Sequence, residues 1–315
     1  MSNIISGLPI NVFYTIIGIF AFLILATIIT FILPVLKPDG NFKELKQRIK
    51  SWWVMIIVFS IAIAISRKIS FAFMGLVSFL ALKEYLTIIP TRMADRRVLL
   101  FAYLSIPIQF YWIATGWYGM FIIFIPVYVF LFLPIVMVII GETEGFLKAV
   151  GSIQWGLMTM VFSLSHMSYL LVLPPENNPN GGSVGLLLFL VLLTQSNDIF
   201  QYISGKLFGK RKIIPKVSPN KTWEGFLGAL AITMLNSYLL SPVLTPFNVY
   251  ESLLLGALLA TMGFFGDLVV SAIKRDLHIK DTGDIIPGHG GVLDRIDSLI
   301  YTAPVFLHFT RYFYY

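Results

Sequence analysis

Apolar runs of about twenty residues recur along the whole length of this 315-residue chain, with short polar segments between them. A run of that length matches the hydrocarbon core of a bilayer when it folds as an α-helix, which satisfies its backbone hydrogen bonds internally. About ten such runs lie at residues 12–36, 52–66, 69–89, 98–114, 117–140, 151–173, 184–204, 225–240, 251–272 and 298–314. The sequence therefore predicts an all-α, polytopic integral membrane protein with about ten transmembrane helices.

The composition supports a membrane protein and excludes several kinds of site. Hydrophobic residues make up 57% of the chain and charged residues 12%, about half the charged share of a soluble domain. The chain has no cysteine, so disulfides, zinc–thiolate sites and cysteine nucleophiles are excluded. The net charge of +7 is weak evidence for nucleic-acid binding, because Lys and Arg in a membrane protein report topology first. We expect no nucleic-acid partner.

Lys and Arg are concentrated in alternate polar segments between the apolar runs. The segments rich in them, which hold 19 of the 23 Lys and Arg, are 37–51, 90–97, 141–150, 205–223 and 273–297. The opposite set of segments holds only Arg67 and Lys68. Because basic loops stay in the cytoplasm, the rich set is predicted to be cytoplasmic and both termini to lie outside. We expect the chain to be integral to the cell (inner) membrane.

The organisation of the chain is simple. It shows no internal repeat and no stretch typical of a soluble domain. We therefore interpret residues 1–315 as a single membrane domain. Its motif-bearing part is 184–315, whereas 1–183 forms N-terminal helices to which the sequence assigns no role.

Polar chemistry is concentrated in residues 271–297, SAIKRDLHIKDTGDIIPGHGGVLDRID, called the signature segment below. Just before it, Asp267 interrupts an apolar run. An Asp within a span costs about 2.5–3.5 kcal/mol on insertion scales, so it should face protein, water or a cation. On a helix, Asp267, Ser271 and Lys274 fall on one face. That face also suits an Asp–Lys pair that only joins helices, so both interpretations stay open.

Asp294 and Asp297 open the last apolar run at a spacing that lets both point to one side of a helix start. A helix start also favours Asp through its dipole, so a structural role fits as well. Mg²⁺ is usually held by one or two carboxylates, with substrate phosphates and water completing the octahedron. We therefore predict Mg²⁺ as cofactor and Asp267 with Asp294 as the metal pair. Asp198, in the seventh run, is a further candidate ligand.

Basic residues and glycines of the signature segment suit phosphate binding. Arg offers bidentate contacts to phosphate oxygens, and Lys offers a movable point charge. Glycine lets backbone N–H groups approach anionic oxygens. The residues concerned are Lys274, Arg275, Lys280, Arg295, Gly288, Gly290 and Gly291, with His289 as a phosphate donor or an orienter of the loop. The positive-inside rule alone would also place Lys and Arg here.

A second polar segment, residues 218–225, reads SPNKTWEG and is called the upstream segment below. It places hydroxyls, an amide and a Lys just before a predicted helix start, which is typical of a phosphate-binding turn. The candidate binding residues are Ser218, Asn220, Lys221, Thr222 and Glu224.

The signature segment resembles, position by position, the signature of the phosphatidate cytidylyltransferases (CDP-diacylglycerol synthases), a family of integral membrane enzymes. The matching positions are Ser271, Lys274, Arg275, Lys280, Asp281, Gly283, Pro287, His289, Gly290, Gly291, Asp294, Arg295 and Asp297. The upstream segment is similar to the family's second shared segment. The two segments cover under a fifth of the chain. Gln201 departs from the small residue of many members, which leaves the nucleotide or lipid preference open.

The resemblance implies transfer of a cytidylyl group from CTP to phosphatidate, with Mg²⁺, giving CDP-diacylglycerol and pyrophosphate for phospholipid biosynthesis. The implied catalytic residues are Asp267, Asp294, Lys274 and Arg275. The implied substrate-binding residues are Ser218, Asn220, Lys221, Thr222, Glu224, Ser271, Lys280, Asp281, His289, Gly290, Gly291, Arg295 and Asp297. The implied partners are CTP and phosphatidate in the bilayer, at an active site on the cytoplasmic side. Whether the chain forms a homodimer stays open.

Two other functions stay open from the sequence. The acceptor could be another lipid phosphate, such as an isoprenoid ether lipid. A membrane ion or solute transporter would instead use Asp198, Glu224 and Asp267 as intramembrane ion ligands. Such transporters often show repeated halves, and this chain lacks them.

Overall fold

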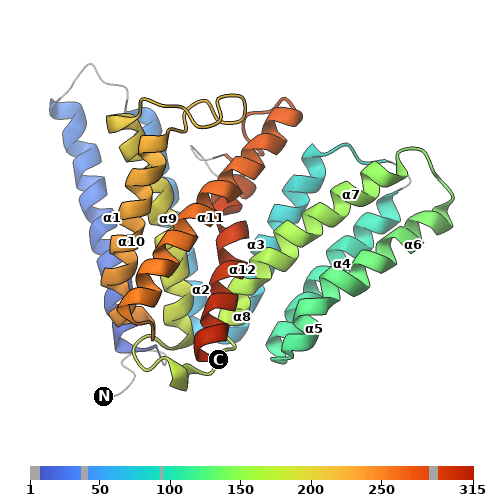
Figure 1. The fold of residues 1–315 in the computed structure, drawn as a ribbon, viewed down its shortest axis with the longest axis horizontal. Coiled ribbons are helices and arrows are strands. Elements are labelled where there is room, and N and C mark those ends of the chain that lie inside the picture. Colours follow the sequence, from blue (N-terminus) through green and yellow to red (C-terminus); the bar gives the residue numbers. More distant parts are fainter. Residues whose placement is uncertain (1–7, 37–41, 93–94, 284–289) are drawn as a thin grey trace.

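The computed structural model describes residues 8–36, 42–92, 95–283 and 290–315. These residues fold into a bundle of long helices (Figure 1). Outside the helices, the described residues form loops and one isolated antiparallel bridge between Lys212 and Thr222. This architecture confirms the prediction of an all-α polytopic membrane protein.

Most connections between the helices are short, whereas those before α10 and before α12 are longer. In chain order they are α1 (Ile10–Leu36), α2 (Lys43–Ile65), α3 (Arg67–Ile88), α4 (Arg96–Ala114), α5 (Tyr118–Ile123), η2 (Phe124–Val129), α6 (Phe130–Ile140), α7 (Phe146–Gly156), η3 (Leu157–Ser163), α8 (Leu164–Leu170), η4 (Pro175–Asn177), α9 (Gly182–Phe208), α10 (Trp223–Leu244), α11 (Val249–Asp276) and α12 (Leu293–Tyr314). The elements η2 and η3 are π-helical turns inside longer helical runs, and η4 is a short 3-10 turn. Pro126 lies in η2, where its missing N–H favours a departure from the α-helical ladder.

Each predicted apolar run coincides with a helix or with consecutive helices. Within the part of the chain that the structure describes, eight helical spans are long and apolar enough to cross a membrane. The two described runs outside that set are α7–η3–α8 and α12. Both are shielded by protein, since every residue of α8 and more than half of α12 is buried. A helix that faces other helices rather than lipid needs a less apolar surface.

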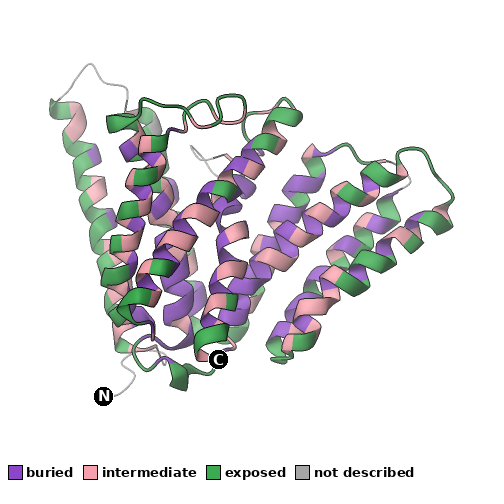
Figure 2. Ribbon diagram, viewed as in Figure 1, coloured by how far each residue is buried: buried purple, intermediate pink, exposed green. Residues whose placement is uncertain are grey.

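The last helix, α12, lies at the centre of the bundle. It packs against α11 and α9 on one side and against α8 and α3 on the other (Figure 1). Figure 2 shows that burial is concentrated along α8, α9 and α12, whereas α1 is mostly exposed. The polar start of α12 is therefore held inside the protein by helices from both halves of the chain.

The two polar segments lie at the same end of the bundle. The C-terminal ends of α9 and α11 and the N-terminal end of α10 lie together, opposite the start of α1 and the end of α12 (Figure 1). After α11 the chain turns back into the molecule, because Thr282, Gly291 and Asp294 are buried. In the same view α12 begins at a lower level than the end of α11. The signature segment thus reaches from the surface into the interior.

Candidate active site

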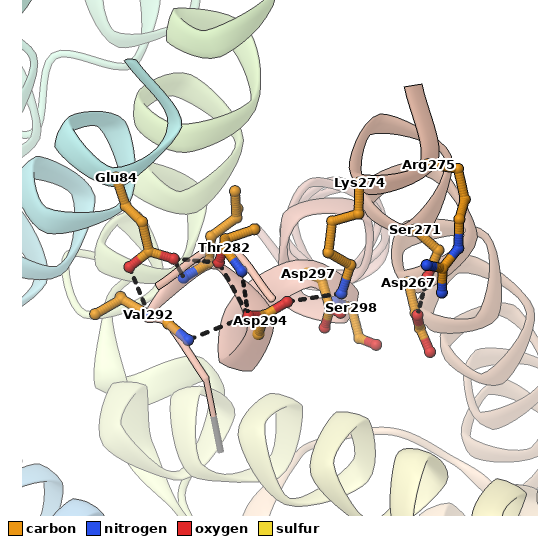
Figure 3. A network of polar contacts seen from close by, with 12 residues as sticks. Glu84, Asp267, Ser271, Lys274, Arg275, Thr282, Val292, Asp294, Asp297 and Ser298 are labelled. Atoms are coloured by element: carbon orange, nitrogen blue, oxygen red, sulfur yellow. Dashed lines mark hydrogen bonds and ion pairs between the residues drawn. The ribbon is translucent and has the colours of Figure 1, made fainter. Parts of the chain in front are cut away.

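One continuous helix, α11, carries the first half of the predicted site. As the spacing predicted, Asp267 and Ser271 meet on one face, where the Ser271 hydroxyl donates to Asp267 Oδ1 at 3.1 Å. Lys274 reaches the start of α12, with its Nζ 2.7 Å from Asp294 Oδ1 (Figure 3). The signature segment therefore ties the end of α11 to the start of α12 through an ion pair.

The Asp294 carboxylate is filled by donors of its own segment. Oδ1 accepts from Lys274, while Oδ2 accepts from the backbone N–H of Thr282 at 2.9 Å and from the Gly291 N–H at 3.1 Å and lies 3.0 Å from the Thr282 hydroxyl. Its side chain is only 5% exposed. At Gly290, where φ is +79°, a Cβ would lie 2.6 Å from Asp294 Oδ2. These glycines let the loop wrap around the carboxylate. The Gly291 N–H donates to Asp294 and not to a ligand.

A residue outside both polar segments completes this network. Glu84 of α3 accepts from the N–H groups of Val292 and Leu293 at 2.8 and 3.2 Å and from the Thr282 hydroxyl (Figure 3). Sequence reasoning missed Glu84, because residues 1–183 were given no role. The available signal was an acidic residue inside a predicted span, which by default marks a functional position.

Lys221 of the upstream segment meets Asp267, which precedes the signature segment and accepts from its Ser271. Its Nζ lies 2.6 Å from Asp267 Oδ2 and 2.5 Å from Gln201 Oε1, and it stands 4.8 Å from the centre of the Phe264 ring. The Asp267 side chain remains 31% exposed. The structure therefore brings together the two segments that carry the resemblance, with a lysine of one against the carboxylate that directly precedes the other.

Other residues of the upstream segment shape the loop itself. The Thr222 hydroxyl accepts from the Gly225 N–H at 3.2 Å and caps α10. Glu224 accepts from the N–H groups of Lys210 and Arg211 at 2.9 and 3.1 Å, which folds the loop back on the helix start. Ser218 is half-buried and Asn220 is exposed. A role for these four residues in substrate binding stays a prediction.

Three carboxylates from three helices share one region of the site. Asp198 of α9 accepts from the Ser298 hydroxyl at 3.0 Å, and Asp297 of α12 accepts from the Ser298 N–H at 2.8 Å. Asp267 and Asp198 are close enough to Asp297 for their negative charges to repel it. Lys221 and Arg295 attract Asp198 through their positive charges. In the view of Figure 3, Asp297 and Lys274 lie between Asp267 and Asp294.

The remaining predicted residues lie around this centre. Arg275 is exposed and its Nε donates to the Val217 carbonyl at 3.2 Å, which joins α11 to the loop before α10. Lys280 and Asp281 are exposed, and Arg295 is half-buried. His289 lies outside the described residues, as does Pro287. Gly290 and Gly291 belong to the loop around Asp294.

The carboxylates do not form a closed cage for a metal. Among the residues the structure describes, no three Asp, Glu or His side chains converge closely enough to hold a metal ion by themselves. Each member of the predicted metal pair instead forms an ion pair with a lysine, Asp267 with Lys221 and Asp294 with Lys274. The arrangement offers hard oxygen ligands and movable positive charges side by side.

Comparison with known proteins places this geometry in a family. Over 294 residues the chain is 47% identical to a protein of Escherichia coli strain K12 with the name Uncharacterized protein YnbB, covering 93% of this chain and 96% of the other. It is 40% identical over 129 residues to the phosphatidate cytidylyltransferase of Haemophilus influenzae, and 45% identical over 115 residues to that of Bacillus subtilis. These two matches cover 39% and 36% of this chain.

The matched part spans less than half the length of those two enzymes, 45% and 42% respectively. The family assignment covers far more, since residues 46–313 match the cytidylyltransferase family. That range contains the upstream segment, the signature segment and Glu84. The chain, which joins these elements in one polar site inside a helical membrane bundle, therefore belongs to the cytidylyltransferase family.

Proposed function

We propose that this protein transfers the cytidylyl group of CTP to phosphatidate, giving CDP-diacylglycerol and pyrophosphate, with Mg²⁺ as cofactor. We place the reaction at the cytoplasmic face of the inner membrane. Support comes from the family, from partial relatives named phosphatidate cytidylyltransferase, and from basic segments gathered at one end of the bundle.

The observation that carries this proposal is the contact between Lys221 and Asp267, because Asp267 also accepts from Ser271 and so joins the two polar segments into one site of mixed charge. Cytidylyl transfer brings two polyanions together, the lipid phosphate and the triphosphate. A site for it needs positive charge for the phosphates and carboxylates for a divalent cation, at the edge of the bilayer. Lys221, Lys274 and Arg295 supply the first, and Asp267 and Asp294 the second, with Asp198 and Asp297 nearby.

Two buried donors strengthen the case for an anionic ligand. Arg295 Nε and Gln201 Nε2 are buried and have no hydrogen-bond partner among the described residues. Buried polar groups are normally satisfied, so an unpaired pair of donors in one site calls for acceptors from outside the protein. Phosphate oxygens of CTP or of the lipid would provide them. Gln201 is also the position at which the chain departs from many family members, which connects it with substrate preference.

The residues present fit Mg²⁺. Carboxylates are its preferred protein ligands, and it binds through one or two of them together with substrate phosphates. An open arrangement of Asp267, Asp198 and Asp297, with Asp294 behind its lysine, suits an ion that arrives with the triphosphate. When bound, Mg²⁺ would be held by Asp267 and Asp294, with Asp198 and Asp297 near, and Lys274 would leave Asp294 Oδ1 for the phosphates. The ion would screen the repulsion between the phosphates.

The protein's own groups account for the rest of the reaction. A phosphate oxygen of the lipid, already anionic near neutral pH, attacks the α-phosphorus of CTP without a dedicated base. The new oxygen–phosphorus bond forms as the bond to the bridging oxygen breaks, and pyrophosphate leaves with that electron pair. Lys221 and Lys274 stabilise the charge that builds on the leaving group. Arg275, exposed at the end of α11, lies where soluble nucleotide would enter.

The test is product formation by the purified protein in detergent, given phosphatidate, radiolabelled CTP and Mg²⁺, with and without EDTA. Labelled CDP-diacylglycerol that disappears with EDTA and returns with added Mg²⁺ is the expected result. Formation of labelled product only from another lipid phosphate would keep cytidylyl transfer and change the acceptor. No product from any lipid phosphate would overturn the proposal and favour transport.

A further inference from the structure

Glu84 is a buried carboxylate that neither polar segment contains. It lies in α3, is 7% exposed, and accepts hydrogen bonds from three groups of the signature segment. Its partners lie 198 to 209 residues later in the sequence. Glu84 is the one acidic side chain of α3, and its long-range contacts fix the signature segment against that helix.

Two of the three contacts cap α12. The first N–H groups of a helix have no acceptor within the helix, and negative charge there is stabilised by the helix dipole. The N-cap residue of α12, Val292, has an apolar side chain that makes no such cap. Glu84 supplies the cap from another helix, through Val292 to Oε2 and Leu293 to Oε1. Both oxygens of the carboxylate are needed for this contact.

The loop is built around the Glu84 carboxylate. A Cβ on Gly291 would lie 1.8 Å from Glu84 Oε1, and a Cβ on Gly283 would lie 3.3 Å from Glu84 Cδ. Gly291 is one of the glycines of the HGG sequence, for which phosphate binding was predicted. Its lack of a side chain makes room for Glu84, so the glycine and the glutamate form one fitted pair.

The third contact passes the constraint on to the charged site. The Thr282 hydroxyl lies between two carboxylates, within hydrogen-bond distance of Glu84 Oε1 and 3.0 Å from Asp294 Oδ2. Asp294 in turn holds Lys274 at 2.7 Å. An unbroken chain of polar contacts therefore runs from α3 through the loop to α12 and α11 (Figure 3).

We propose that Glu84 is a positioning residue for cytidylyl transfer: it fixes the start of α12 and the loop, and thereby sets Asp294 and Lys274 in place. This inference rests on the proposed function for its effect on catalysis. Its structural half, the fixing of the loop, is independent of what the site binds. The N-terminal helices thus gain a role in the site through one side chain.

The first experiment compares Glu84→Gln with Glu176→Gln, an isosteric change at an exposed glutamate. Glutamine keeps the shape but turns an amide donor toward one of the two backbone donors. We expect hydrogen exchange at the Val292 and Leu293 amides to quicken at least about tenfold in Glu84→Gln and to stay unchanged in Glu176→Gln. We expect kcat to fall at least about tenfold, with the KM for CTP changed far less.

A second pair of variants tests the inference even if the Glu84→Gln protein does not fold. Thr282→Val removes only the hydroxyl that links the two carboxylates, whereas Thr282→Ser retains it. A lowered kcat in Thr282→Val, rescued in Thr282→Ser, is the expected result. Unchanged amide exchange in a folded Glu84→Gln protein, or equal kcat values for the Val and Ser variants, would overturn the inference. If the wild type transfers nothing to any lipid phosphate, the proposed function fails, and the exchange measurement still decides whether Glu84 fixes the loop.

Discussion

Lys221 Nζ lies 2.6 Å from the carboxylate of Asp267, although Lys221 belongs to the upstream segment before α10 and Asp267 lies in α11, one turn before the signature segment. The contact makes a single site of two motifs that the sequence shows apart. It also means that each member of the predicted metal pair is neutralised by a lysine, since Lys274 does the same for Asp294. The variants below separate what each pair contributes.

Asp267→Asn and Asp294→Asn should differ in stability although both lose activity. Asp267 accepts from Ser271 and Lys221 and is partly exposed, so its amide should leave the unfolding temperature almost unchanged. Asp294 is buried and accepts from Lys274 and from the backbone N–H groups of Thr282 and Gly291, so Asp294→Asn should destabilise the protein by about 1–3 kcal/mol. Turnover of labelled CTP and thermal unfolding in detergent measure the two effects. Near-normal turnover in either variant would remove that residue from the metal pair.

Lys221→Met should reduce kcat/KM for CTP at least about tenfold, because it removes a positive charge next to the triphosphate site. Lys216→Met is the matched control, since Lys216 lies exposed in the same loop. Steady-state kinetics at constant ionic strength would compare the two. Equal losses in both variants would mean that general attraction by the basic loop, not the contact with Asp267, accounts for the effect.

Gly291→Ala should destabilise the folded protein and reduce turnover, because its Cβ would lie 1.8 Å from Glu84 Oε1. Overpacking of this kind costs about 1–3 kcal/mol. The control is Gly151→Ala in α7, where a Cβ would meet no atom within 4 Å. There alanine should be neutral or stabilising by about 0.5–1 kcal/mol. Thermal unfolding of both variants tests the contrast, and an unaffected Gly291→Ala protein would contradict the close fit around Glu84.

The absence of cysteine allows a direct test of topology. Lys216→Cys and Glu176→Cys introduce single thiols at exposed positions in the loop before α10 and in η4. If the basic segments face the cytoplasm, a membrane-impermeant maleimide should label Glu176→Cys in intact spheroplasts and Lys216→Cys only in inverted vesicles. The reverse pattern would place the site on the outer face, where soluble CTP is not available.

The sequence predicted the helices well, because about twenty apolar residues in a row admit only one membrane structure. It also predicted the shared face of Asp267 and Ser271, which depends on helical periodicity alone. It could not show that Lys221 would reach Asp267, since that contact depends on how α9, α10 and α11 pack. Nor could it show that α12, read as one span among others, would be enclosed by protein.

Glu84 was missed for a related reason. In the sequence it stands beside Lys83 near the end of an apolar run, which resembles an ordinary boundary at the membrane surface. Only the return of the chain into the interior after α11 brings backbone N–H groups to this carboxylate. Local pattern indicates which residues have the chemistry, whereas long-range packing decides which of them meet.

The cap that α3 provides for α12 has a consequence for how such enzymes can be recombined. Residues 184–315 contain both motif segments, yet the start of α12 is completed by a side chain 208 residues earlier in the chain. A chimera that joins the first half of one relative to the second half of another takes its α3 from one protein and the loop before α12 from the other. The glutamate on α3 and the glycines of the loop should therefore be exchanged together. The motif-bearing half, transferred alone, would lack the carboxylate that caps α12.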